Sequence, residues 1–271
     1  MARQGEPGPR DAGSPKGPVA GRPSTALRPM RHASLDRCLY CLRDVPGRTE
    51  EHLVPRALGG RWTLRDAVCE DCRRITGRYE QATLDREFAV PKTLLALKRR
   101  RARGKGPSRL PLVLLEGNDV ASPLTADTFP RVFWLPAFEP AERLADGPSE
   151  PARLRFVACT LNLGAPSRRS VAATPTMVDP TAYACSLAKW AYALAVAERG
   201  LQCCDTQAIR DLLLGRRQDV FAFVGSSPEG GASAGWLHDY ELRERAGWLT
   251  VRLALFASAG MAACEIVIGR I

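Results

Sequence analysis

Four of the nine cysteines in this chain occur as two pairs, with two residues between the members of each pair. The first pair is Cys38 and Cys41, the second is Cys69 and Cys72, and 27 residues lie between the pairs. Each pair can form a tight turn against a zinc ion, whose thiolate ligands lie about 2.3 Å from the metal. We therefore expect a structural Zn²⁺ held by all four cysteines. Four unrelated core cysteines would not explain the paired spacing, and a redox role would need only one pair.

The residues between the two pairs include a histidine next to acidic residues. The segment TEEHLVPRALGG has Glu51 directly before His52, and the proline and the two glycines that follow favour a turn. A simple zinc ribbon needs only a short hairpin between its cysteine pairs, so this longer insert indicates a further site. We expect a hairpin that carries the histidine, followed by a helix that starts at the second pair in CEDCRRITGRYEQATLDREF. Two strands and a helix would then surround a histidine beside a carboxylate.

These residues resemble the HNH endonucleases, in particular the subgroup with the pattern CxxC, EHxxPxxLGG and CxxC. The resemblance covers about 50 residues of the chain. The matching positions are Cys38, Cys41, Glu51, His52, Pro55, Leu58, Gly59, Gly60, Cys69, Cys72 and Gly77. A weaker similarity continues downstream, where SLAKWAYALAVAERG is similar to a helix that follows the module in some of these proteins.

The resemblance implies a ββα-metal fold and a metal-dependent endonuclease that hydrolyses the phosphodiester bonds of nucleic acid. In this family the histidine is the general base that takes a proton from water, and a divalent cation stabilises the charge that develops on the phosphate. By position, His52 is the expected base. Glu51 is the expected ligand of a catalytic Mg²⁺ or Mn²⁺, ions that prefer oxygen ligands. The expected partner is nucleic acid, with DNA as the first choice.

Two positions depart from the family pattern. Asp66 stands where the family has a bracing Asn, and it retains oxygen acceptors. Arg73 stands where a final Asn or His completes the metal site, and a guanidinium cannot ligate a metal. In the hypothesis that we favour, catalysis is retained, Arg73 binds phosphate, and another acid completes the coordination; the candidates are Asp66, Asp71 and Glu80. In the alternative, the catalytic metal is lost and the module is a zinc-stabilised nucleic-acid-binding or interaction protein.

Positive charge is concentrated outside the cysteine module. The chain has a net charge of +10, and residues 89–111 hold eight basic and no acidic residues. A basic cluster beside a metal module favours a polyanionic partner, because each Lys or Arg that neutralises a phosphate releases condensed counterions. The candidate nucleic-acid-binding residues are Lys98, Arg99, Arg100, Arg101, Arg103 and Lys105. The alternative for this segment is a solvated linker.

The chain divides into four segments by composition. Residues 1–34 are rich in Gly, Pro, Arg and Ser, and we expect them to be disordered because they have few apolar groups to offset the entropy cost of ordering. Residues 35–90 form the expected HNH-like zinc module, and residues 91–109 form a basic helix or linker. Residues 110–271 are expected to form an α+β domain with antiparallel strands and a long helix, so the fold class is α+β.

The long helix of this last segment has clear boundary signals. Asp179 is the expected N-cap, Pro180 takes the first helical position, and Gly200 ends the helix, with apolar residues every three or four positions between them. A second helix is expected over residues 205–215. The expected strands lie in PLVLLEG, RVFWLPAF, LRFVACTLNL, DVFAFVG, WLHDYELRE, GWLTVRLALFAS and MAACEIVIG.

The composition argues against a membrane or secreted protein. The longest apolar run, TAYACSLAKWAYALAVA, is interrupted by Lys189, and the N-terminus lacks the apolar core of a secretory signal. The odd number of cysteines favours metal binding and buried thiols over disulfides. We therefore expect a cytoplasmic protein without a membrane partner, and the sequence leaves its oligomeric state open. For His32 and His238 we expect structural or solvent-exposed roles.

Overall fold

The structure, a computed structural model, describes residues 31–32, 34–94, 113–116, 119–123, 132–145, 155–160, 178–227, 237–257 and 261–271. Within these residues the chain has an α+β fold, which confirms the predicted fold class. The six candidate nucleic-acid-binding residues between Lys98 and Lys105 lie outside the described residues, as do residues 1–30. The predictions for these two segments therefore stay predictions.

The first described part of the chain forms a small sheet followed by a helix, as predicted. Strand β2 (Thr49–His52) pairs with β3 (Thr63–Val68) in antiparallel fashion, and β1 (Arg31–His32) pairs in parallel with the other edge of β3. Helix α1 (Glu70–Asp85) starts directly after Cys69, which is its N-cap. A short 3-10 helix, η1 (Arg56–Leu58), lies between β2 and β3, and α2 (Ala89–Leu94) follows α1.

The connection between β2 and β3 depends on its proline and glycines. Pro55 directly precedes η1 and has φ of −53°, a value that its ring favours. Gly59 ends η1 with φ of 88°, in the left-handed region that favours glycine. A Cβ atom at Gly60 would lie 1.9 Å from the carbonyl oxygen of Val54, so this position accepts no larger residue. This tight connection brings the histidine end of β2 against β3.

Helix α3 (Pro180–Arg199) is the long helix predicted from the sequence. The Asp179 carboxylate accepts a hydrogen bond from the backbone N–H of Ala182 at 2.9 Å, and Gly200 ends the helix with φ of 80°. Of its 20 residues, 14 are buried, so the helix must have neighbours on more than one face. Helix α4 (Gln207–Leu213), also predicted, follows it.

An antiparallel sheet with strand order β8-β11-β10-β9 forms most of the described C-terminal part. Only the last two of the seven residues predicted as a strand in DVFAFVG belong to one, because Val220–Ala222 form the 3-10 helix η3. In a 3-10 turn, residues three apart share a face, and both Val220 and Phe223 are buried. The strands of this sheet are β8 (Val224–Ser226), β9 (His238–Arg245), β10 (Trp248–Leu255) and β11 (Cys264–Arg270). The remaining elements are η3 (Val220–Ala222), η2 (Glu142–Leu144), and the paired strands β4 (Val113–Glu116) with β5 (Asp119–Pro123) and β6 (Val132–Ala137) with β7 (Arg155–Thr160).

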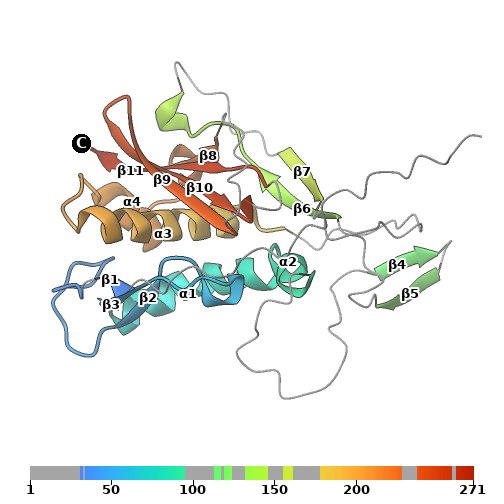
Figure 1. The fold of residues 1–271 in the computed structure, drawn as a ribbon, viewed down its shortest axis with the longest axis horizontal. Helices are drawn as coiled ribbons and strands as arrows, with labels where there is room; N and C mark the ends of the chain where they lie inside the picture. Colours follow the sequence, from blue (N-terminus) through green and yellow to red (C-terminus); the bar gives the residue numbers. More distant parts are fainter. Residues whose placement is uncertain are drawn as a thin grey trace, which may run out of the picture.

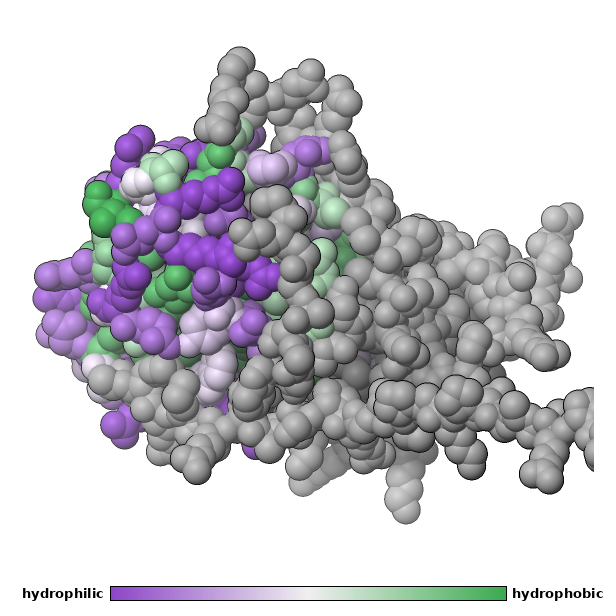
Figure 2. All heavy atoms as spheres, turned by 45° about the horizontal axis from the view of Figure 1, so that its top comes forward, coloured by the Kyte–Doolittle hydropathy of each residue, from purple (hydrophilic) through white to green (hydrophobic). Residues whose placement is uncertain are grey.

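Helix α3 lies between the C-terminal sheet and the N-terminal module (Figure 1). It contacts β10 and β11 on one side and α1 on the other. One hydrophobic core therefore extends from Cys38 in the module to Ile268 in β11. The coloured part of the surface in Figure 2 is mainly hydrophilic, with small hydrophobic groups interspersed. The described helices include none that is both long enough and apolar enough to cross a membrane.

Candidate functional site

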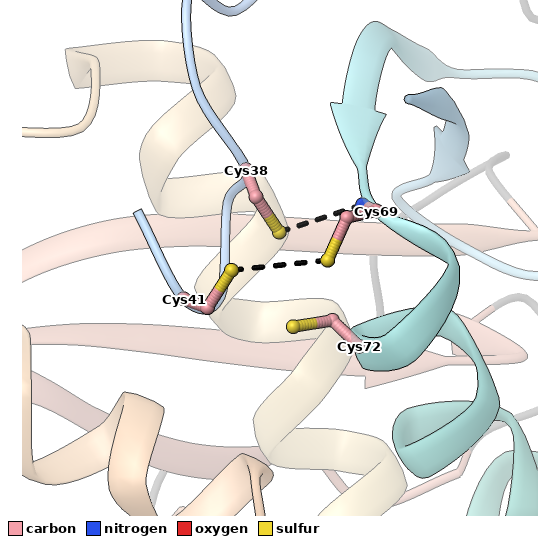
Figure 3. A group of neighbouring side chains, drawn as sticks. All are labelled: Cys38, Cys41, Cys69 and Cys72. Carbon is pink, nitrogen blue, oxygen red and sulfur yellow. Dashed lines mark hydrogen bonds between the residues drawn. The ribbon is translucent and has the colours of Figure 1, made fainter. Parts of the chain in front are cut away.

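The four paired cysteines come together in space (Figure 3). Their sulfur atoms all lie within 4.8 Å of one another, and the Sγ atoms of Cys41 and Cys69 are 3.8 Å apart. In a tetrahedral site with zinc–sulfur distances near 2.3 Å, neighbouring sulfurs are about 3.8 Å apart. The donor set and its spacing therefore fit a zinc ion. Among the described residues, no second group of three or more His, Cys, Asp or Glu side chains is placed to hold a metal.

The backbone around each pair directs its sulfurs inward. The first pair lies in a turn in which the N–H of Leu42 donates to the carbonyl oxygen of Cys38 at 2.9 Å, and Leu42 has φ of 59°. The second pair spans the junction of β3 and α1, so that Cys69 caps the helix and Cys72 lies in its first turn. The cluster thus ties the loop before β2 to the helix that follows β3.

Hydrogen-bond donors around the cluster favour the thiolate form of cysteine. The backbone N–H of Cys69 donates to Cys38 Sγ at 3.5 Å, and Arg43 Nε donates to Cys41 Sγ at 3.4 Å. The pKa of Cys38 is lowered to about 4, chiefly because its sulfur accepts a hydrogen bond from the Cys72 thiol; the same hydrogen bond raises the pKa of Cys72, and burial raises that of Cys69. The thiolate is the form of cysteine that ligates zinc, and the Cys69 N–H and the Arg43 guanidinium are the donors that stabilise it here.

The predicted acid and base lie at the end of β2, where His52 is paired with Thr63 of β3. Successive side chains of a strand point to opposite faces. Accordingly, Glu51 is buried, with 6% of its surface exposed, whereas His52 keeps partial contact with solvent. Burial lowers the pKa of His52, an effect that nearby carboxylates oppose. His52 is therefore a neutral imidazole near pH 7, which is the form that a general base requires.

A buried lysine of α3 pairs with Glu51. Lys189 Nζ lies 2.8 Å from Glu51 Oε1 and 2.7 Å from Glu80 Oε2, and the side chains of Lys189 and Glu51 are only 5% and 7% exposed. The indole N–H of Trp190 donates to the other carboxylate oxygen of Glu80 at 2.6 Å. Burial alone would lower the pKa of Lys189, but the two carboxylates reverse this effect and the pKa is raised. Lys189 is therefore an ammonium ion between two carboxylates.

The catalytic divalent ion that the family resemblance implies does not fit this arrangement. The carboxylate of Glu51 contacts the Lys189 ammonium, and both oxygens of Glu80 already accept hydrogen bonds. Arg73 on α1 offers no acceptor, and its guanidinium pairs with Glu70 at 2.6 Å. The oxygen atoms that Mg²⁺ or Mn²⁺ would require are thus in contact with a cation of the protein itself.

Two other acids considered from the sequence lie in different surroundings. Asp66 is an exposed residue of β3 with φ of 49°, and its carboxylate accepts a hydrogen bond from the Ser34 hydroxyl at 2.7 Å. Asp71 is exposed on α1, where it pairs with two arginines. Of the acids proposed to complete a metal site, Glu80 is therefore the one that lies beside Glu51.

Lys189 and Trp190 are site residues that the sequence analysis did not identify. The sequence contained one signal, because Lys189 is the only charged residue within the run TAYACSLAKWAYALAVA. A lysine is almost never fully buried without a partner. Its partner Glu80 precedes it by 109 residues, so only the tertiary structure identifies the pair.

His238, for which a structural role was expected, joins the module to the C-terminal sheet. It is the first residue of β9 and is buried, with Nε2 2.8 Å from the carbonyl oxygen of Leu58 in η1. The backbone N–H of Phe256 donates to Nδ1 at 3.2 Å, so Nε2 carries the proton. Burial lowers the pKa of His238 to about 4, and the ring is neutral at pH 7.

Comparison with known proteins agrees with this geometry. Residues 38–89 match the family model described as HNH endonuclease. No curated protein and no solved structure matches the chain. The matched segment contains the cysteine cluster, both strands of the hairpin that carries His52, and α1. Residues 38–89 are therefore similar in sequence to the HNH endonucleases, and the cysteine cluster and His52 both lie within this matched segment.

Proposed function

We propose that the chain acts on nucleic acid through its HNH module, as a nuclease in which His52 is the general base. The observation that supports this proposal best is the environment of His52. It lies at the end of β2 inside the matched module, keeps partial solvent contact, and has a lowered pKa. A neutral imidazole in contact with water can take a proton from that water as its oxygen bonds to the phosphorus atom of a phosphodiester, while the P–O bond to the leaving sugar oxygen breaks and that oxygen takes a proton from solvent.

The charge of the chain supports a nucleic-acid substrate, and DNA is the substrate that we propose. Residues 89–111, directly after the core of the module, hold eight basic and no acidic residues. Counterion release would make their contribution to affinity strongly salt-dependent. We assign no catalytic step to Mg²⁺ or Mn²⁺, because Lys189 contacts both carboxylates that would bind such an ion.

We also propose that the cysteine cluster binds one Zn²⁺ per chain with a structural role. Four thiolate ligands close a tetrahedron and leave no open position for substrate. Because Cys69 joins β3 to α1, the ion would fix the helix to the hairpin that carries His52.

Binding of nucleic acid without cleavage is the second candidate function. Two observations favour it: the ion pair between Lys189 and Glu51, and the presence of Arg73 where the family has a metal ligand. In this case the module would be a zinc-stabilised binding or interaction module rather than a catalyst.

Plasmid cleavage and gel shift together separate the two candidates. Zinc-loaded full-length chain is incubated with supercoiled plasmid, with and without Mg²⁺ or Mn²⁺, beside His52→Ala and a control, His32→Ala on β1 of the same sheet. For a nuclease, the wild type and His32→Ala nick or cut the plasmid, and His52→Ala is slower by about 10²-fold or more, as expected for loss of a general base. A gel shift without cleavage in all three proteins favours the binding function. Equal cleavage by wild type and His52→Ala would contradict the role of His52.

A further inference from the structure

Buried Glu51 and Lys189 and partly buried Glu80 form a cluster to which three separate elements contribute, β2, α3 and α1. One oxygen of each carboxylate lies within 2.8 Å of the same lysine nitrogen, so both carboxylates point at one position. The Trp190 indole N–H holds the second oxygen of Glu80 at 2.6 Å and fixes the orientation of that carboxylate. The chain thus builds a site for a cation and fills it with its own ammonium group.

The charge balance of this cluster is unusual for a purely structural ion pair. With both acids ionised, two carboxylates and one ammonium carry a formal charge of −1; Glu51 is buried, which raises its pKa, and the Glu80 side chain is 19% exposed. Desolvation costs several kcal/mol for each buried ion, so a second carboxylate beside a single ammonium is a poor way to add stability. A pair of converging carboxylates suits a divalent cation better, because Mg²⁺ and Mn²⁺ bind hard oxygen ligands and carry the charge that neutralises both.

We propose that the Lys189 ammonium occupies a divalent-cation position between Glu51 and Glu80, so that the native chain binds no Mg²⁺ or Mn²⁺ there. Loss of the lysine charge should open this position to such an ion. The inference concerns residues of the proposed nuclease site, but it does not depend on whether the module cleaves nucleic acid.

Competition for the same oxygen atoms explains why the lysine excludes an ion. A divalent ion of this class binds oxygen at about 2.0–2.2 Å, which leaves no space for an ammonium nitrogen 2.7 and 2.8 Å from those atoms. Lys189 also lies within the buried part of α3, between Ala188 and Trp190, which are both fully buried. The lysine therefore has no exposed position to which it can retreat without unpacking the helix.

Titration with Mn²⁺, followed by electron paramagnetic resonance, tests this proposal directly, because Mn²⁺ loses its free-ion signal on binding. The proteins compared are the zinc-loaded wild type, Lys189→Met, which keeps the length and removes the charge, and a control, Lys92→Met. Lys92 also lies beside a carboxylate, that of Asp85 at 3.7 Å. The zinc cluster does not compete, because Mn²⁺ prefers oxygen to thiolate ligands.

We expect Lys189→Met to bind one Mn²⁺ per chain at least about tenfold more tightly than wild type or Lys92→Met, and Mn²⁺ to raise its Tm. Adding Glu51→Gln to Lys189→Met should abolish both effects. Mn²⁺ binding by wild type that is lost in Glu51→Gln would overturn the proposal. A folded Lys189→Met protein with no gain over wild type would also overturn it.

If Lys189→Met fails to fold, the double variant Lys189→Met with Glu80→Gln restores the formal charge of −1 and retains Glu51. Mn²⁺ should raise the Tm of this double variant. Adding Glu51→Gln should abolish that rise. A double variant that folds without responding to Mn²⁺ would overturn the proposal. His52→Ala should bind Mn²⁺ as wild type does, so failure of the proposed nuclease function would appear in the plasmid assay and not here.

Discussion

The segment that matches the HNH family model contributes to two clusters of side chains of the types that bind metals, and the two clusters differ in which part of the chain supplies their remaining member. The cysteine cluster consists of four soft ligands from within residues 38–72, and their spacing fits a zinc ion. The carboxylate cluster combines Glu51 and Glu80 of the module with Lys189 of α3, far away in sequence. All four members of the cysteine cluster thus come from the module itself. The carboxylate cluster, which includes the acid beside the expected general base, is instead completed by Lys189 from the C-terminal part of the chain.

Replacing one cysteine of the cluster tests whether the cluster binds zinc, and we expect this change to have the largest effect on stability. Cys69→Ser is expected to release zinc and to lower the free energy of unfolding by more than about 4 kcal/mol, because metal binding contributes to folding free energy. Cys185→Ser on α3, outside the cluster, is the control and should change stability by about 1 kcal/mol or less. Zinc content and urea unfolding measure both effects. Unchanged zinc content and stability in Cys69→Ser would contradict the zinc assignment.

Replacing the lysine of the carboxylate cluster should have the next largest effect on stability. Lys189→Met leaves the buried Glu51 and the partly buried Glu80 without their cation and is expected to destabilise the chain by about 3–5 kcal/mol in the absence of Mn²⁺. Lys92→Met removes a looser pair, at 3.7 Å to a largely exposed Asp85, and should cost less than Lys189→Met. Urea unfolding of the two variants provides the measurement. Equal stability of the two variants would mean that Lys189 is not the cation that neutralises Glu51.

Acid should weaken the contact between the module and the C-terminal sheet through His238. Its pKa is about 4 in the folded chain, against 6.5 for an ordinary histidine, so the unfolded chain binds the proton first as the pH falls. Stability is therefore fully present above pH 6.5 and declines between pH 6.5 and 4, by about 3 kcal/mol in total. His238→Gln should flatten this part of the stability curve, as measured by urea unfolding at a series of pH values. The same slope in His238→Gln and wild type would assign the effect to other groups.

Restoring the family residue at position 73 should have the smallest effect on stability. Arg73→Asn removes an exposed pair with Glu70, which contributes about 1 kcal/mol or less. Because Lys189 still contacts both carboxylates, we expect no gain in Mn²⁺ binding from this change alone. Isothermal titration with Mn²⁺ is the measurement. A new Mn²⁺ site in Arg73→Asn with Lys189 intact would show that the final ligand, and not the lysine, decides metal binding.

Local signals in the sequence predicted much of the fold. The spacing of the cysteines predicted a cluster that the structure brings together, because a turn with two intervening residues brings both sulfurs to one side. Asp179 and Gly200 predicted both ends of α3, since an N-cap carboxylate and a glycine with positive φ act within a few residues. The strand predicted over DVFAFVG was partly wrong, because burial of two residues three apart favoured a 3-10 turn over an extended chain.

The sequence could not reveal what lies beside Glu51. Glu51 and His52 are adjacent in the chain, so the family pattern could be recognised from the sequence. Lys189, the partner of Glu51, belongs to a helix that packs on the module only in the folded chain. The charge in the middle of an apolar helix was visible, and it indicated only that the helix was not a membrane span. A buried lysine requires a buried anion, and which anion is decided by tertiary packing.

The metal content of the native chain tests the contrast between the two clusters most directly. Purified protein is brought to equilibrium by dialysis against Zn²⁺ and Mn²⁺ together, and both metals are measured by elemental analysis. We expect one zinc and no manganese per chain, with zinc lost in Cys69→Ser. A chain without zinc, or one manganese per chain that disappears in Glu51→Gln, would contradict this expectation.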